Sequence, residues 1–412
     1  MTHSNSPVKS GFILFILMLT IAIDVMGLGL IFPIIPEIIL DPHNSLFFNI
    51  TTPNSIRYFW YGMVFAMWPL GMFFGSSIFG RLSDQYGRKK LLLTSLFGVS
   101  VSYFLSVIAI GLHSVVLFTV SRLTVGIFGG SFALAQATII DVSAKDKVAR
   151  NLSYVTLAGS IGFIFGPLLT TVVGYISSGL MQAALPCLVA GVLSLINTLS
   201  VYIFLKETRI TNISERLKIK ILDMLFSFRV MFTDKRIIVL ALSYLLMQAA
   251  WGFYMQNFPL VLSEIYHLNQ SEIGLSFVLA AIFDFITVLV ILPFLTKRFP
   301  LKFIVILSGI LLGLNLLFAV IIPNLWLQYV TFVIAFILQL VFYSAILAWL
   351  SHKVSEDEQG QIMGGTVSVF GLAWAINAIL LGLFANLSIL LPVYLAIIGF
   401  ILAGVIAAAV KK

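Results

Sequence analysis

Gly-Arg-Leu-Ser-Asp-Gln-Tyr-Gly-Arg-Lys-Lys, residues 80–90, separates two long apolar runs, 58–79 and 91–112. Its two glycines allow a tight turn, because glycine adopts backbone conformations that other residues avoid. The segment carries four basic residues and a single acid, Asp84. The pattern predicts a basic hairpin that holds two apolar helices at one surface of a membrane.

The composition of the whole chain also indicates a membrane environment. Of 412 residues, 60% are hydrophobic and only 10% are charged, and the mean hydropathy is +1.09. A soluble protein carries about 25% charged residues, so we expect an integral membrane protein. The single cysteine, Cys187, excludes a disulfide framework and a metal site built from thiols. The net charge of +8 does not indicate a nucleic-acid partner, because the basic residues lie in short loops.

Twelve apolar runs approach or exceed the roughly 20 residues that a membrane-spanning helix needs. They are 12–36, 57–79, 91–112, 114–139, 151–175, 182–205, 236–262, 272–295, 302–322, 325–349, 361–386 and 388–410. A polar segment, 206–235, divides them six and six. We therefore predict an all-α membrane protein with an N-terminal bundle (1–205), a basic linker (206–235) and a C-terminal bundle (236–412). Within the linker, 219–232 is amphipathic and is predicted to lie along the membrane surface.

The basic residues give the orientation. When loops are assigned alternately to the two sides, one side holds 22 of the 24 Lys and Arg residues. The other side has only Arg57, and Arg122 falls inside a helix. Since cytoplasmic loops carry the excess of Lys and Arg, this bias predicts that both termini are cytoplasmic.

Three formal charges lie well inside predicted helices: Asp24, Arg122 and Asp284. Each costs about 2.5–3.5 kcal/mol at a helix centre on an insertion scale, so each needs a partner or a wet cavity. At about 1.5 Å per residue, Asp24 lies roughly 18 Å from the cytoplasmic start of its helix, and Arg122 roughly 12 Å from the outer end of its own. The two therefore lie at similar heights and are expected to pair if their helices are neighbours. Asp284 is expected near the midplane.

The pattern G-x-L-x-D-x-x-G-R-K between the second and third spanning helices resembles the signature loop of the major facilitator superfamily. The resemblance implies two six-helix bundles that bind substrate between them near the bilayer midplane and rock alternately. It also implies a conformational latch at Gly80, Arg81, Asp84, Gly87, Arg88 and Lys89. In the family, the loop Asp engages the start of the eleventh helix, here after Gln359-Gly360; a helix N-terminus favours an anion.

Three further motifs are similar to those of the twelve-helix drug:proton antiporter group, which includes the tetracycline exporters. The first helix reads Asp24-x-x-Gly27-x-Gly29-x-x-x-Pro33-x-x-Pro36. The fourth contains Arg122-x-x-x-Gly126-x-x-Gly129-Gly130, and the resemblance links this Arg to proton transfer. The fifth contains Gly162-x-x-x-Gly166-Pro167, whose small residues allow close helix packing and which the group associates with export. Thr170 and Thr171 replace the last two glycines of that motif and weaken the prediction of export.

We expect Asp24, Asp284 or both to bind a proton in one conformation and release it in another, with a moving Arg122 switching Asp24 between the two. The alternative is a static Asp24–Arg122 ion pair, with Asp284 hydrogen-bonded to a neighbouring helix. Helices one, four, seven and ten line the substrate cavity of the resembled fold. The candidates there, with one residue on helix eleven, are Gln136, Gln248, Trp251, Tyr254, Gln256, Asn257, Gln339, Tyr343 and Asn377, each of which could instead serve helix packing.

The sequence thus predicts proton-coupled export of a small organic molecule, a drug or metabolite, across the cytoplasmic inner membrane. The alternatives are proton-coupled uptake of a metabolite and export of an endogenous product such as a siderophore. No motif of a nucleophile, metal-ligand cluster or phosphate loop points to an enzyme. We expect a monomer whose partners are its substrate, protons and the lipid bilayer, with no nucleic acid and no cofactor beyond the proton gradient.

Overall fold

The computed structural model describes residues 7–41, 45–143, 147–208 and 228–410. This part of the chain is helical and contains no strand. The N-terminal helices are α1 (Pro7–Ile39), α2 (Asn54–Tyr86), α3 (Arg88–Gly111), α4 (Val115–Phe128), α5 (Ser131–Val142), α6 (Val148–Ile176) and α7 (Leu180–Phe204). The C-terminal ones are α9 (Ile238–Glu264), α10 (Gln270–Ile286), the π-helix η2 (Thr287–Ile291), α11 (Leu292–Arg298), α12 (Leu301–Ile321), α13 (Leu325–His352), α14 (Glu356–Phe384) and α15 (Leu391–Ala408).

Every predicted apolar run corresponds to one helix or to consecutive helices. Ten described helices are long and apolar enough to cross a membrane, and α2 and the pair α4–α5 account for the two remaining runs. Two runs are interrupted. The run 114–139 breaks at Gly129–Gly130, and the run 272–295 passes through the π-helical turn η2. Of the predicted surface helix 219–232, residues 219–227 lie outside the described part of the chain.

The predicted hairpin at 80–90 is mostly helix. α2 continues through Tyr86, and α3 begins at Arg88. Only Gly87 turns the chain, with a φ of 95°, a value that residues with a Cβ rarely adopt. Gly80 therefore belongs to α2, and the expectation of a two-glycine turn was wrong: one glycine reverses the chain.

The described helices group into two compact units. The first contains Met1–Ile34 and Leu70–Ile219, and the second contains Ile35–Pro69 and Lys220–Lys412. Both α1 and α2 therefore pass from one unit to the other. The crossing points coincide with prolines, between Pro33 and Pro36 in α1 and at Pro69 in α2. Proline bends a helix because it removes a backbone hydrogen bond. The division into bundles at 205 and 236 stays a prediction.

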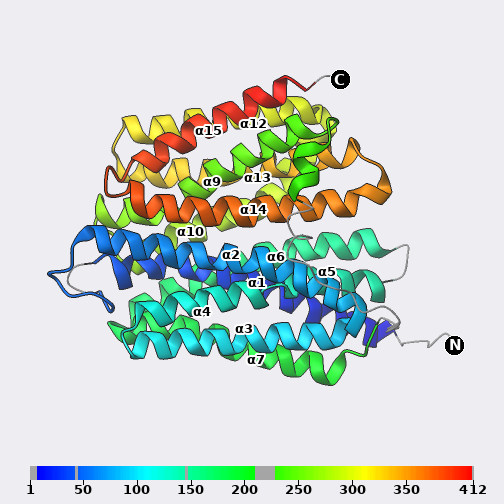
Figure 1. The fold of residues 1–412 in the computed structure, drawn as a ribbon, viewed down its shortest axis with the longest axis horizontal. Helices are drawn as coiled ribbons and strands as arrows, with labels where there is room; N and C mark the ends of the chain where they lie inside the picture. The colour runs from blue at the N-terminus through cyan, green and yellow to red at the C-terminus, as the bar shows by residue number, and fades with distance from the viewer. Residues whose placement is uncertain (1–6, 42–44, 144–146, 209–227, 411–412) are drawn as a thin grey trace. The chain divides into compact units, whose positions relative to one another are not determined.

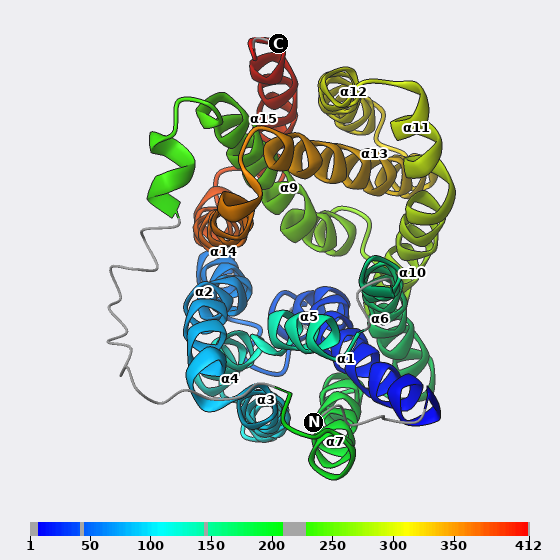
Figure 2. The ribbon, with the colours of Figure 1, turned by 90° about the vertical axis from the view of Figure 1, so that its right-hand side faces the viewer.

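Within the first unit, α3 packs along α7 and α4, and α5 lies next to α1 and α6 (Figure 2). Within the second, α9 packs along α15 and α14, and α12 along α13 and α15 (Figure 1). Large apolar side chains such as Ile176, Ile203 and Trp326 are exposed on the outside of these helices. In water this surface would be unfavourable, and hydrocarbon is its natural solvent.

A buried arginine anchors the segment between α1 and α2. Arg57 is 1% exposed and contacts the Phe48 ring. Its guanidinium donates hydrogen bonds to the backbone carbonyls of Ile39, Asp41, Asn49 and Thr52, at 2.7–3.4 Å. Five N–H donors in a rigid fork suit this task, since one side chain can satisfy several loop carbonyls. Farther along α2, the Tyr61 hydroxyl donates to the Gln256 carbonyl on α9, 2.9 Å away.

Candidate functional site

The first unit contains a buried polar cluster around Asp24. Ser131, which is fully buried, donates a hydrogen bond to Oδ2 of Asp24. The other carboxylate oxygen, Oδ1, is buried without a hydrogen-bond partner. Ser131 is the first residue of α5, so the break at Gly129–Gly130 places a helix N-terminus beside the carboxylate. The dipole of that helix favours a negative charge at this end.

Arg122 of α4 is the cation of this cluster. It is 1% exposed, and both terminal nitrogens of its guanidinium lack a hydrogen-bond partner. The Tyr103 hydroxyl lies close enough to Arg122 and Asp24 to interact electrostatically with both. A Cβ on Gly27 would lie 1.8 Å from that hydroxyl oxygen, so α1 approaches Tyr103 through a glycine. The cluster therefore holds a carboxylate and a guanidinium, and each has at least one polar atom without a hydrogen-bond partner.

The expected Asp24–Arg122 ion pair is not formed. No ion pair joins the two among the described residues, and Asp24 takes its hydrogen bond from Ser131 instead. The physical reason is the break between α4 and α5, which brings the start of α5 to the carboxylate. Sequence reasoning missed both Ser131 and Tyr103. Gly129-Gly130 was the available signal, since paired glycines interrupt helices and a serine follows them directly.

The glycines of α6 pack directly against α1. A Cβ on Gly162 would lie 2.1 Å from the Ala22 carbonyl oxygen, and one on Gly166 would lie 2.4 Å from that of Met26. Backbone-to-backbone contact of this kind requires small residues, as the motif predicted. The two threonines that replace family glycines donate their hydroxyls to the Pro167 carbonyl, each at 2.8 Å. They are satisfied within their own helix.

The signature loop is tied to neighbouring segments by charge. Arg88 pairs with Asp141, which lies in the last turn of α5, at 3.3 Å. The Glu207 carboxylate accepts the backbone N–H groups of Arg88 and Lys89, at 2.8 and 3.2 Å. These are the first two residues of α3, so Glu207 binds at a helix N-terminus, where an anion is favoured. The side chains of Arg81 and Asp84 lie outside the described part of the structure.

A second charged group joins the linker to the start of α14. Arg236 pairs with Asp234 at 2.6 Å and with Glu358 at 2.8 Å. The hydrogen bond from Arg236 lowers the pKa of Glu358 to about 2, and the same cause lowers the pKa of Asp234. The hydrogen bonds to these acids raise the pKa of Arg236 in turn. Glu358 also closes a capping box with Ser355, so the acid both begins α14 and holds the linker.

Asp284 lies in the second unit, half-buried near the end of α10. Three residues later the chain enters η2, the π-helical turn. Such turns are rare and often occur at functional sites. No hydrogen bond or ion pair involves the Asp284 side chain among the described residues. The hydrogen bond to a neighbouring helix, which was the alternative to a proton-binding role, is therefore not formed within the described part of the chain.

Several of the polar cavity candidates donate hydrogen bonds to neighbouring groups in this structure. Gln248 donates to Tyr244 at 2.7 Å, Asn257 to the Ile389 carbonyl at 2.9 Å and Asn377 to the Ala249 carbonyl at 2.7 Å. Trp251 and Tyr254 lie within an aromatic cluster with Phe258, Phe332 and Phe336. The half-buried candidates are Gln136, Gln339 and Tyr343.

One residue outside the predicted set belongs with these candidates. Trp374 of α14 is buried, and its indole N–H has no hydrogen-bond partner. The backbone carbonyl of Trp374 accepts a hydrogen bond from the side-chain amide nitrogen of Gln256 at 3.2 Å. The amide oxygen of Gln256 is also buried and has no hydrogen-bond partner. Neighbouring side chains thus leave one donor and one acceptor unsatisfied. Buried polar atoms without a hydrogen-bond partner are uncommon in folded proteins.

The comparisons with known proteins agree with this architecture. The sequence profile of the Major Facilitator Superfamily matches residues 17–364 and, again, 240–411. The chain belongs to the major facilitator superfamily. This is a family of transporters rather than of enzymes, and the protein crosses the membrane many times. No group of three or more His, Cys, Asp or Glu residues in the described chain could hold a metal ion.

Among curated superfamily members, the chain is 26% identical to the class C tetracycline resistance protein of Escherichia coli over 374 residues, which covers 88% of this chain and 87% of that protein. It is 33% identical to the class G protein of Vibrio anguillarum over 193 residues, 47% of this chain and 45% of that one. Solved structures share the fold at low identity. The D-xylose-proton symporter aligns with a TM-score of 0.74 at 13% identity over 97% and 98% of the two chains. The human organic anion transporter MFSD10 aligns at 0.68 and 18% over 98% and 100%.

Proposed function

We propose that this superfamily transporter exports a small organic molecule from the cytoplasm in exchange for protons. The Asp24 cluster carries the proposal. It combines a half-buried acid whose Oδ1 is buried and unpartnered with a buried arginine that lacks an ion-pair partner among the described residues. Such an arrangement is expensive in a low-dielectric interior unless its charge state can change.

Proton-coupled exchange requires a side chain that binds a proton in one conformation and releases it in another. The Ser131 hydroxyl and the N-terminus of α5 stabilise the ionised form of Asp24. Protonation of Asp24 removes its charge and with it the need for those partners. A conformational change that separated α5 from α1 would therefore promote proton uptake, and their approach would promote release. Arg122 and Tyr103 set the local field without neutralising the acid directly.

Tetracycline is the first substrate to assay, because the relative that matches most of the chain is a tetracycline resistance protein. The unpartnered indole N–H of Trp374 and amide oxygen of Gln256 are proposed as hydrogen-bonding groups for the substrate. Gln136, Gln339 and Tyr343 are the proposed half-buried contacts. We propose further that the protein acts as a monomer in the cytoplasmic membrane with both termini inside, and that Asp284 is a second proton site.

The alternatives are proton-coupled uptake and export of an endogenous product. Thr170 and Thr171 replace two glycines of the export-associated motif, and this difference is the reason to test both alternatives. A transport assay with purified protein in liposomes separates these possibilities. A pH gradient is imposed, and labelled tetracycline, other drugs and metabolites are offered as substrates. Exchange against protons predicts that substrate flux changes direction when the gradient is reversed, with the substrate moving against the protons. Movement of both in the same direction would establish uptake instead.

The site is tested with Asp24→Asn, which keeps the shape and the acceptor oxygen. We expect this variant to lose gradient-driven transport while retaining substrate exchange at equal pH on both sides. Asp284→Asn is tested in parallel. Full gradient-driven transport by Asp24→Asn would refute the role of this cluster.

A further inference from the structure

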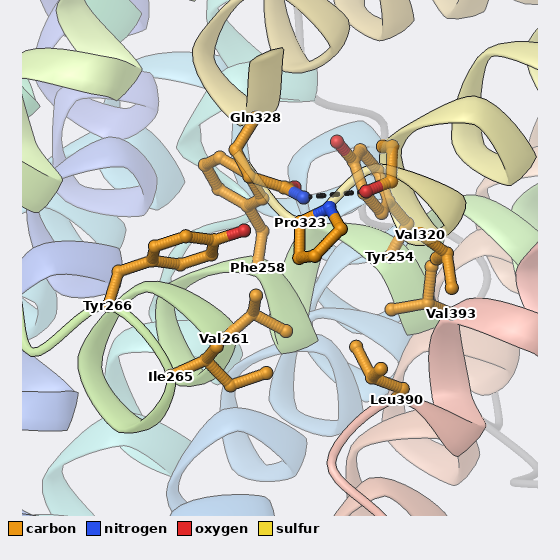
Figure 3. Close-up of a pocket in the computed structure, with 11 residues that line it drawn as sticks. Tyr254, Phe258, Val261, Ile265, Tyr266, Val320, Pro323, Gln328, Leu390 and Val393 are labelled. Atoms are coloured by element: carbon orange, nitrogen blue, oxygen red, sulfur yellow. Dashed lines mark hydrogen bonds between the residues drawn. The ribbon is translucent and has the colours of Figure 1, made fainter. Parts of the chain in front are cut away.

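The two ends of α12 differ in their chemistry. The last turn of α12 borders a small pocket, where Gln328 of α13 donates to the Ala319 carbonyl at 2.8 Å (Figure 3). No acid, lysine, arginine or histidine lines that pocket. At the other end of the helix, the turn from α11 into α12 carries Lys297, Arg298 and Lys302. An anionic ligand of this part of the second unit would therefore bind at the beginning of α12.

Exposed aromatic rings accompany these cations. The Arg298 guanidinium lies over the Phe294 ring, 4.2 Å from its centroid, and Phe299 is stacked on Phe303 with centroids 5.4 Å apart. The three rings are 40–49% exposed. Side chains of this kind suit the bilayer interface, where rings reach hydrocarbon while cations stay in the polar layer. We call this region the basic–aromatic surface; it consists of Phe294, Lys297, Arg298, Phe299, Lys302 and Phe303.

No acid balances the charge of this surface within the described part of the chain. Lys297 and Arg298 are exposed, and neither forms an ion pair there. Lys302 donates its Nζ to the Val410 carbonyl, just after α15, at 2.6 Å. Asp and Glu are absent from residues 285–355 of the sequence. The first turn of α12 likewise contains no acid, and its N-cap offers no side-chain hydrogen bond.

The corresponding end of the first unit is balanced by an acid. Counting six spanning segments to a half, α12 corresponds to α3, and α15 corresponds to α7. Lys89, the second residue of α3, donates its Nζ to the Tyr202 carbonyl near the end of α7 at 2.8 Å, which is the contact that Lys302 makes with the end of α15. In the first unit, the Glu207 carboxylate binds the beginning of α3. The beginning of α12 has no such acid among the described residues, so an anion bound there would come from outside the chain.

We propose that the basic–aromatic surface binds the headgroup of an anionic phospholipid. The headgroup phosphate lies against Lys297, Arg298 and the beginning of α12, and the acyl chains lie along the exposed rings. A guanidinium and a helix N-terminus both suit phosphate oxygens. A soluble phosphate would contact the cations but leave the rings uncovered, whereas a lipid covers both. The proposal concerns lipid binding and does not depend on the transported substrate.

The test places a fluorescent reporter beside this surface. Thr296→Cys in the full-length protein is labelled with bimane, because the native Cys187 is buried and does not compete for the label. In phosphatidylcholine nanodiscs, two nitroxide-labelled lipids with identical chains are compared as quenchers, phosphatidylglycerol and phosphatidylcholine. Each Lys or Arg near a membrane surface contributes about fivefold to affinity for anionic lipid, so the two exposed cations predict roughly 25-fold stronger quenching by phosphatidylglycerol. Equal quenching by the two lipids would overturn the proposal.

The deciding variant combines Lys297→Gln with Arg298→Gln. Both side chains are exposed, and their replacement is expected to remove most of the preference for phosphatidylglycerol while leaving quenching by phosphatidylcholine unchanged. Lys90→Gln combined with Lys235→Gln is the matched control, because it removes two exposed charges elsewhere and is expected to keep the preference. Lys297→Gln alone, with an expected loss of about fivefold, replaces the double variant if that does not elute as a folded monodisperse protein.

Two further results would overturn the proposal. One is a preference that survives in the double variant, or falls equally in the matched control, since the effect would then come from the net charge of the protein. The other is loss of the preference when inorganic phosphate is added at constant ionic strength, which would assign these cations to a soluble anion rather than to a lipid.

Discussion

The contact between α1 and α6 gives the sharpest structural prediction. A Cβ placed on Gly162 would lie 2.1 Å from the carbonyl oxygen of Ala22 and 2.8 Å from its carbonyl carbon and Cα. The first distance is 1.3 Å short of the 3.4 Å at which ordinary contact begins. All three atoms belong to the helix backbone, so no side-chain rotation can relieve the overlap.

Gly162→Ala must therefore push the two helices apart by roughly an ångström. Overpacking of this kind costs typically about 1–3 kcal/mol, and a backbone neighbour places this site at the upper end. Ala22 lies two residues before Asp24, so the displacement would also disturb the hydrogen bond from Ser131. We expect a lower thermal unfolding midpoint in detergent and, in the protein that remains folded, reduced transport.

Gly159→Ala is the matched control, one turn earlier in the same helix. Its Cβ would meet only the Val25 side chain, at 3.8 Å, an ordinary contact. Alanine is a better helix former than glycine by about 1 kcal/mol, so this variant is expected to be as stable as wild type or more so. Equal unfolding midpoints for the two variants would show that α6 does not pack against α1 through Gly162.

Three further predictions concern regions outside that contact. Arg57→Gln leaves loop carbonyls unpartnered and is expected to cost about 3 kcal/mol or more of stability, measured by denaturant titration; a loss below about 1 kcal/mol would contradict the anchoring role. Because the hydrogen bond from Arg236 lowers the pKa of Glu358 from its ordinary 4.5 to about 2, the stabilisation from this pair is complete above pH 4.5 and is lost as the pH falls toward 2. Wild type should lose thermal stability across that window more steeply than Glu358→Gln, and identical pH profiles would exclude the effect. Tyr61→Phe removes one hydrogen bond to the Gln256 carbonyl and should cost about 1 kcal/mol, whereas an unchanged unfolding midpoint would show that this contact contributes nothing.

The sequence by itself determined the helices and their solvent. Apolar runs of membrane length and a content of 10% charged residues admit few folds other than spanning helices. Each unsatisfied backbone polar group and each uncompensated side-chain charge is costly in hydrocarbon. Local chemistry also located Asp24 and Arg122 as charges inside spanning helices and marked Gly162 and Gly166 as packing positions. These inferences succeeded because each depends on a residue type and its spacing along one helix.

Tertiary structure decided which groups meet. Depth along two helices suggested that Asp24 and Arg122 would pair, but depth does not fix which way a side chain points around the helix axis. The break at Gly129–Gly130 brought Ser131 to the carboxylate instead, and α1 approaches the Tyr103 hydroxyl closely through Gly27. Glu358, one of the two acids that pair with Arg236, likewise comes from a segment distant in sequence. Pairings of this kind depend on the packing of whole helices, which no single stretch of sequence contains.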